Sequence, residues 1–157
     1  MRVVVISDSH GQGSVVDRII RRECEAQIVV FLGDVTGDIE DFTYEYTDKK
    51  FYIVSGNCDI FPEFPYTTVA QVAQTKIFIT HGHTLNVKYG TSALAQAARQ
   101  SGCQIALYGH THIPDIHYED GLYIVNPGSC ARSRDGANSY AAIDIRENGI
   151  LPVIIRI

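Results

Sequence analysis

The sequence of 157 residues predicts a single α/β domain, residues 1–157, in which two sheets pack face to face and helices lie outside. Two observations predict this class. Up to residue 109, apolar runs of strand length alternate with segments whose apolar residues recur at helical spacing. From residue 115 onward, apolar and polar residues alternate between turn signals, which indicates antiparallel strands. A chain of this length can bury a sizeable core.

The first half of the chain predicts three buried strands. The β-branched run at 2–7 (RVVVIS) is typical of a strand buried on both faces, and 27–33 and 49–56 repeat the pattern. A helix is expected over 14–24, where Ser14 is placed to cap its N-terminus. The segment 36–48 is expected to form a short helix, or a turn followed by a loop.

The second half predicts one further helix and a set of strands. Residues 66–82 fit two strands around a tight turn near Gln74-Thr75, and 104–109 is another buried strand. The alanine-rich segment 91–102 is a good helix that Gly102 stops. Two antiparallel pairs are expected to end the chain, 115–126 with a turn at Gly121 and 139–157 with a hairpin at Asn148-Gly149.

Composition and charge narrow the possible partners. The net charge of −5 argues against binding along a nucleic-acid backbone, which needs a basic surface, although bound cations would still permit an anionic substrate. The first ten residues lack a secretory core, and no stretch approaches the ~20 apolar residues of a membrane span. The four cysteines are far apart and form no C-x-x-C pair, so no disulfide framework is expected. These features predict a cytoplasmic protein without a membrane partner.

Five predicted strands end in polar residues of the same kinds. Carboxylates, an amide and imidazoles follow them, at Asp8-Ser9-His10, Asp34, Asn57-Cys58-Asp59, His81-Gly82-His83 and His110-Thr111-His112. The carboxyl ends of strands in an α/β sheet form ligand sites, so these side chains are expected at one edge. Turn chemistry could explain each cluster alone, but turns have no need of histidines. Carboxylate and imidazole suit first-row divalent metals, which Asp34 could bridge.

These residues, in this order, resemble the calcineurin-like metallophosphoesterases. The resemblance rests on Asp8-x-His10, Gly33-Asp34, Gly56-Asn57, His81 and Gly109-His110-x-His112, and residues 126–129 (NPGS) with the arginines that follow are similar to its small bacterial and archaeal phosphodiesterase branch. It implies a four-layer α/β/β/α sandwich of two mixed sheets. It also implies two divalent ions, Mn²⁺ by preference and otherwise Ni²⁺, Co²⁺, Fe²⁺ or Zn²⁺. One ion would be held by Asp8, His10, Asp34 and His112, and the other by Asp34, Asn57, His81 and His110.

The activity that the resemblance implies is hydrolysis of a small phosphoester, as a phosphodiesterase, by a hydroxide that bridges the two ions. Asp34, Asn57, Cys58 and His83 are the candidate catalytic residues. Cys58 departs from the wider family, which has a histidine at this position as the general acid. His83 could contact substrate or orient a ligand.

The sequence allows two roles for each of several other polar residues. Asp59 could orient His10 or cap a loop, and Arg132 and Arg134 could clamp phosphate or lie in a solvated loop. His117 is expected at the surface.

Two alternative functions remain open from the sequence. One is a phosphomonoesterase that acts on nucleotides or other small phosphoesters. The other is a protein-interaction scaffold of the same fold, like a subunit of the retromer coat. Loss of metal-ligand residues would indicate such a scaffold. Every ligand position of the family is filled here. A chain this short has short loops and a shallow site, which a second subunit could help to wall, so a homodimer or higher homo-oligomer is also expected.

Overall fold

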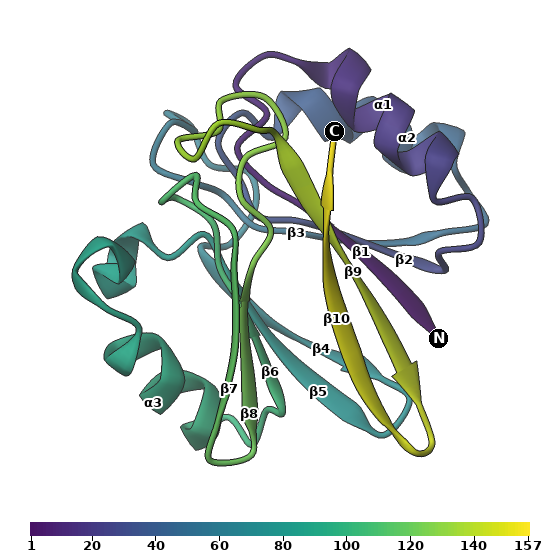
Figure 1. The fold of residues 1–157 in the computed structure, drawn as a ribbon. Coiled ribbons are helices and arrows are strands. Elements are labelled where there is room, and N and C mark those ends of the chain that lie inside the picture. Colours follow the sequence, from purple (N-terminus) through teal and green to yellow (C-terminus); the bar gives the residue numbers. More distant parts are fainter.

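The computed structural model describes residues 1–157 and contains two five-stranded sheets packed against each other (Figure 1). The strand order is β10-β9-β1-β2-β3 in the first sheet and β4-β5-β6-β8-β7 in the second. Helices α1 and α2 cover the outer face of the first sheet, and α3 packs on β6 and β8 of the second. The layers therefore run α/β/β/α, as the sequence predicts.

The elements follow the predicted order along the chain. The first sheet contains β1 (Arg2–Ile6), β2 (Ile28–Phe31), β3 (Lys50–Ile53), β9 (Ser139–Arg146) and β10 (Gly149–Arg156). The second contains β4 (Thr67–Val72), β5 (Thr75–Thr80), β6 (Ile105–Leu107), β7 (Asp115–Glu119) and β8 (Leu122–Asn126). The helices are α1 (Gly13–Arg22), α2 (Gly37–Glu45) and α3 (Ser92–Gln100), with 3₁₀ turns η1 (His83–Leu85) and η2 (Val87–Tyr89).

Both sheets are mixed. Strands β1, β2 and β3 are parallel neighbours, and so are β5, β6 and β8, while β9 and β10 and the edge strands β4 and β7 are antiparallel. The parallel strands therefore end at a common edge in each sheet. In β10, which has only β9 as a neighbour, Pro152 lies opposite Ile143.

The core lies on both sides of each sheet, because successive residues of a strand point to opposite faces. In β1, Val3 and Val5 belong to the apolar cluster between the sheets, whereas Val4 and Ile6 pack in the cluster under α1 and α2. A third cluster lies between α3 and the second sheet. This double burial explains why the strand sequences are continuously apolar.

The structure corrects several details of the prediction. Ser14 does not cap α1, which begins at Gly13 and has no side-chain cap. Ser14 lies inside the helix, whose N-cap residue is Gln12. Before the helix, Asp38 holds the turn by accepting hydrogen bonds from the Gly11 N–H (2.8 Å) and the Ser9 hydroxyl (2.6 Å). The turns also begin one residue early, since β5 starts at Thr75 and β10 at Gly149.

The helices and the cysteines bear on two expectations drawn from composition, which concern membrane spans and disulfides. None of the helices has the length and apolar character that a membrane crossing requires. All four cysteines are free thiols, as the absence of a paired spacing predicts.

Candidate metal centre

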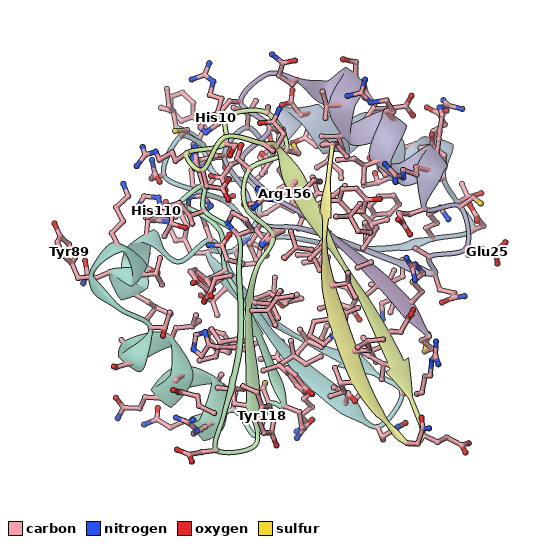
Figure 2. All side chains as sticks on the ribbon, viewed as in Figure 1. His10, Glu25, Tyr89, His110, Tyr118 and Arg156 are labelled. Atoms are coloured by element: carbon pink, nitrogen blue, oxygen red, sulfur yellow. The ribbon has the colours of Figure 1, made fainter.

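Loops that follow five strands bring the candidate residues to one pocket at the edge of the sandwich. Asp8 follows β1, Asp34 follows β2, Asn57 follows β3, His81 follows β5, and His110 with His112 follows β6. The pocket has a volume of about 320 Å³ and is lined by His10, Asp34, Asn57, Cys58, Lys88, His110, His112, Arg132 and Arg134. Histidines 10 and 110 both lie at the end of the molecule where these loops gather (Figure 2).

The backbone of the pocket is held in an unusual conformation. Nine residues other than glycine have a positive φ, and five of them are candidate ligands. These five are Asp8, His10, Asp34, His110 and His112, with φ between 46° and 68°. Left-handed conformations cost free energy in residues with a Cβ atom, and they gather at functional sites where the surrounding structure enforces them. The left-handed backbone therefore coincides with five of the seven ligand positions that the sequence predicts.

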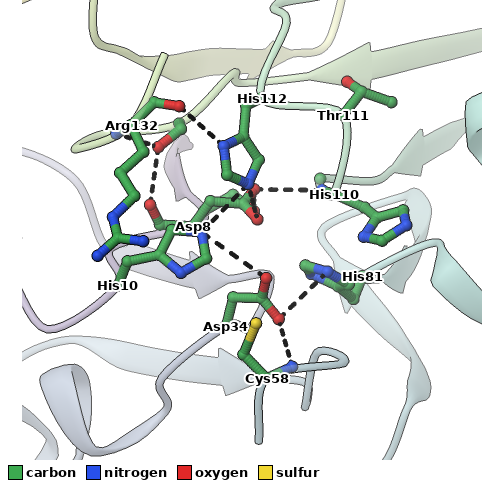
Figure 3. Close-up of polar contacts among 12 residues, drawn as sticks. Asp8, His10, Asp34, Cys58, His81, His110, Thr111, His112 and Arg132 are labelled. Atoms are coloured by element: carbon green, nitrogen blue, oxygen red, sulfur yellow. Dashed lines mark hydrogen bonds and ion pairs between the residues drawn. The ribbon is translucent and has the colours of Figure 1, made fainter. Parts of the chain in front are cut away.

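The first group of ligand atoms belongs to Asp8, His10, Asp34 and His112, and all of these atoms lie within 4.8 Å of one another. The His112 Nε2 atom is 3.2 Å from Asp8 Oδ1 and 3.1 Å from His10 Nε2 (Figure 3). The Asp8 side chain is fully buried. The facing Asp8 carboxylate raises the pKa of His112, so protonation of this imidazole would offset the charge of Asp8 when no ion is bound.

Backbone carbonyls orient two of the imidazoles. His112 Nδ1 lies 2.8 Å from the Arg132 carbonyl, and His81 Nδ1 lies 2.7 Å from the Leu32 carbonyl. Each Nδ1–H therefore donates to a carbonyl, which leaves the Nε2 lone pair facing the pocket. Ligand histidines in metal proteins are held in the same way.

A second group of ligand atoms lies beside the first and shares Asp34 with it. His81 Nε2 is 3.4 Å from Asp34 Oδ1 and 3.1 Å from Asn57 Oδ1, and the His81 and His110 ring centroids are 5.0 Å apart. The other oxygen of Asp34, Oδ2, lies 3.8 Å from His10 Nε2. Burial, with His81 and Lys88 nearby, lowers the pKa of His110 to about 4, so its imidazole is neutral and free to ligate at neutral pH.

The donor set fits divalent metal ions. Carboxylate oxygens, an amide oxygen and neutral imidazole nitrogens are the ligands that borderline first-row metals accept. Asp8 Oδ1 is buried and accepts no hydrogen bond, because the facing His112 nitrogen carries the lone pair in its neutral form. A buried carboxylate oxygen without a partner costs free energy, which a bound cation would offset.

Asp59 holds the loops that carry two of the ligands. Its Oδ2 accepts hydrogen bonds from the backbone N–H groups of Asp34 (3.1 Å) and Gly56 (2.7 Å), and its Oδ1 accepts from Val35 (3.0 Å) and Thr36 (2.8 Å). Of the two roles that the sequence allows for Asp59, the structure shows the loop cap. At Gly56 a Cβ atom would lie 2.2 Å from Asp34 Oδ1, so only glycine permits the two loops to approach.

The remaining predicted residues divide between the pocket and its surroundings. Cys58 lines the pocket, and burial together with the Asp34 carboxylate raises the pKa of its thiol to about 11. His83 does not line the pocket and packs against the Tyr66 and His81 rings, at centroid distances of 5.2 and 5.3 Å. His117 lies on β7 outside the pocket, where its Nδ1 contacts Asp115 at 2.8 Å.

Lys88 is a pocket residue that the sequence reasoning missed. It lies on η2, in a segment for which no helix or strand was predicted. Val87 beside it is buried and packs on Gly82, so the turn that presents Lys88 is anchored to the second sheet. The only signal in the sequence is a basic residue shortly after the His81-Gly82-His83 cluster.

Comparison with known proteins identifies relatives along nearly the whole chain. A probable metallophosphoesterase of Bacillus subtilis, YsnB, is 30% identical over 149 residues, which cover 94% of this chain and 86% of that protein. The Escherichia coli phosphodiesterase YfcE is 29% identical and covers 98% of this chain and 91% of its own. Vacuolar protein sorting-associated protein 29 of Schizosaccharomyces pombe is 30% identical over 81% of this chain and 65% of that protein.

The fold agrees with these relatives. The crystal structure of a predicted phosphoesterase from Streptococcus pneumoniae superposes with a TM-score of 0.85 at 26% identity, over 99% of this chain and 88% of that one. Residues 1–148 match the model of the calcineurin-like phosphoesterase superfamily domain. With the Asp–His pocket in place, the chain belongs to the calcineurin-like phosphoesterase superfamily and is a metallophosphoesterase by family.

Proposed function

We propose that this protein hydrolyses small phosphodiesters with two divalent metal ions. The observation that carries the proposal is the position of Asp34, whose Oδ2 faces His10 and whose Oδ1 faces His81. One ion would be held by Asp8, His10, Asp34 and His112, and the second by Asp34, Asn57, His81 and His110. When bound, such ions polarise phosphoryl oxygens and lower the pKa of a bound water.

The residues of the chain have separate tasks in this proposal. The carbonyls of Leu32 and Arg132 keep the lone pairs of His81 and His112 directed at the ions. Asn57 supplies a neutral oxygen. Cys58 faces the substrate as a protonated thiol, which is a weak hydrogen-bond donor and a poor replacement for an imidazolium. His83 packs on the His81 ring and lies 6.1 Å from the His110 ring, so it would orient these ligands or contact the substrate.

A diester substrate is favoured over a monoester by the name of the relative YfcE, a phosphodiesterase. The mixed set of three oxygen and four imidazole ligands suits first-row divalent metals, from Mn²⁺ to Zn²⁺. A scaffold function is the alternative, since one relative is named for vacuolar protein sorting. The filled ligand positions, their strained backbone and the basic residues around the pocket all favour a catalytic site over a scaffold.

The test combines metal content with two chromogenic esters. Protein purified without chelator is analysed for bound metals, and hydrolysis of bis-p-nitrophenyl phosphate and p-nitrophenyl phosphate is measured with added Mn²⁺. We expect faster hydrolysis of the diester, loss of activity with EDTA and recovery with Mn²⁺. A preference for the monoester would support a phosphomonoesterase. A protein that binds no metal and hydrolyses neither ester would support the scaffold.

A further inference from the structure

Three basic side chains border the pocket and have no acidic partner. Lys88, Arg132 and Arg134 line it, and none of the three side chains forms an ion pair or donates a hydrogen bond. The chain as a whole has 13 basic and 18 acidic residues. Elsewhere, six of the ten lysines and arginines are paired with carboxylates, and four form no ion pair, namely Arg18, Arg22, Lys50 and Lys76. Three of the seven unpaired cations of an acidic protein therefore line this one pocket.

These cations approach the pocket from two sides. Arg132 lies on the side of His10 and His112 in Figure 3, away from His110. Lys88 comes from η2, which follows the loop of His81. A diester whose phosphate lay over the candidate ligands would extend its two substituents toward these two sides.

The segments that present the cations are fixed. The Ser129 hydroxyl donates to the Asp8 carbonyl (2.7 Å) and accepts from the Arg132 N–H (2.6 Å). The Arg134 N–H donates to the His112 carbonyl (3.1 Å). On the other side, Val87 anchors the turn of Lys88. Charged groups on a fixed backbone bind an anion at a smaller entropic cost than groups on a mobile loop.

The charges exceed what one diester requires. In the proposed function, two divalent ions face the carboxylates of Asp8 and Asp34, and this leaves a net positive site before any rim residue is counted. A phosphodiester carries a single negative charge. Three more cations at the rim are accounted for if the substrate brings a second anionic group, because guanidinium and ammonium groups bind phosphate by charge-assisted hydrogen bonds.

We propose that these rim cations provide a subsite for a second phosphate carried by a substituent of the diester, through Arg132 and Arg134 on one side of the pocket or through Lys88 on the other, and that the preferred substrates are small phosphodiesters with a phosphorylated substituent. This inference rests on the proposed function. A pocket of about 320 Å³ takes a ligand of nucleotide size. The net charge of −5 disfavours a long polyanion such as a nucleic acid, which needs a basic surface along its length.

The test uses two esters that differ by one phosphate. They are the p-nitrophenyl ester of thymidine 5′-phosphate and the same ester with a 3′-phosphate, which share the scissile bond and the leaving group. We expect kcat/KM to be about 10-fold or more higher for the phosphorylated ester, from one or two charged hydrogen bonds in a partly open site. The advantage should shrink as salt is raised, because the three side chains are exposed.

The variant Lys88→Gln/Arg132→Gln/Arg134→Gln should bring the ratio of the two kcat/KM values to about one. Arg18→Gln/Lys76→Gln is the matched control, since both residues are exposed and distant from the pocket lining, and it should keep the ratio. An equal ratio in the unmodified protein, or a ratio that survives in the triple variant, would overturn the subsite. Equal losses on both esters would mean that the cations contact the scissile phosphate instead.

Binding separates this inference from the proposed function. Calorimetry in EDTA should give tighter binding of thymidine 3′,5′-bisphosphate than of thymidine 5′-phosphate, and the triple variant should lose the difference. If bis-p-nitrophenyl phosphate is hydrolysed but neither kinetics nor binding responds to the second phosphate, the subsite alone is wrong. If no ester is hydrolysed but the binding preference is present, the proposed function fails and the subsite stands.

Discussion

Replacement of Asp59 by alanine should destabilise the protein and weaken metal binding together. The carboxylate accepts four backbone hydrogen bonds of 2.7 to 3.1 Å. Each bond to a charged acceptor contributes about 1.5–3 kcal/mol when its loss leaves the donor unsatisfied. The residue is half-buried, so water can reach some of the freed N–H groups. The four bonds also belong to one network and are not additive. We therefore expect a loss of about 3 kcal/mol, well below the sum.

Urea and thermal unfolding measure this loss. For a domain of this size, about 3 kcal/mol corresponds to a fall in Tm of roughly 6–12 °C. Affinity for Mn²⁺ should fall by about 10- to 100-fold, because Asp59 positions the backbone of the ligand Asp34. Asp59→Asn should not restore the stability or the Mn²⁺ affinity. Each carboxylate oxygen of Asp59 accepts two backbone N–H groups, and the NH₂ group of asparagine, which can only donate, would face one such pair.

Asp48→Ala is the matched control. The Asp48 side chain is 75% exposed and forms an ion pair with Lys49 at 3.7 Å, so its removal should hardly change stability. A loss below about 1 kcal/mol in Asp59→Ala, or a full rescue by asparagine, would refute the reasoning.

Three further predictions concern the chemistry of the site. Asp34→Asn should abolish hydrolysis of bis-p-nitrophenyl phosphate and lower the amount of bound metal, because one lost charge weakens both groups of ligands. The control Asp41→Asn, on the exposed surface of α2, should alter neither quantity. An Asp34→Asn protein that turns over with two ions still bound would contradict the bridging assignment. Cys58→His should raise kcat/KM selectively for alkyl esters, because their leaving group needs a proton. General-acid catalysis by the new histidine could raise kcat/KM by up to about 10²–10⁴-fold. Equal changes for alkyl and nitrophenyl esters would point to another proton donor. At limiting Mn²⁺, the metal content should fall as the pH is lowered below neutrality. Asp8 raises the pKa of His112, so a proton on this imidazole competes with the ion. A metal content that does not change with pH would contradict this.

Much of the fold and of the site could be predicted because both depend on short-range patterns. The runs at 2–7 and 27–33 are apolar on both faces, and this identifies buried parallel strands without further information. Once such strands are placed, their carboxyl ends bring Asp8 and Asp34 to one edge by geometry alone.

The features that escaped prediction depend on contacts between distant segments. The turn before α1 is held by Asp38, which is 25 residues after Gly13, and the local sequence around Ser14 does not reveal this contact. For Asp59 the sequence leaves two roles open, and the loop cap is decided only by four donors from two loops. Lys88 reaches the pocket only because two 3₁₀ turns follow the His81 loop, and such turns have no periodicity that a sequence reveals.

The edge strand β10 bears on how copies of this chain can associate. Proline has no N–H group, so Pro152, which is paired in register with Ile143 of β9, cannot donate a hydrogen bond from either side of the strand. The unpaired N–H groups along the outer edge of β10 could pair with a strand of another molecule. Pro152 lacks such a group, so it interrupts this row near the middle of the strand. Exposed apolar side chains at Leu151 and Val153 would otherwise make this edge prone to amyloid-like stacking. A homo-oligomer, if it forms, should use another surface, and Pro152→Val should increase aggregation of the otherwise folded protein.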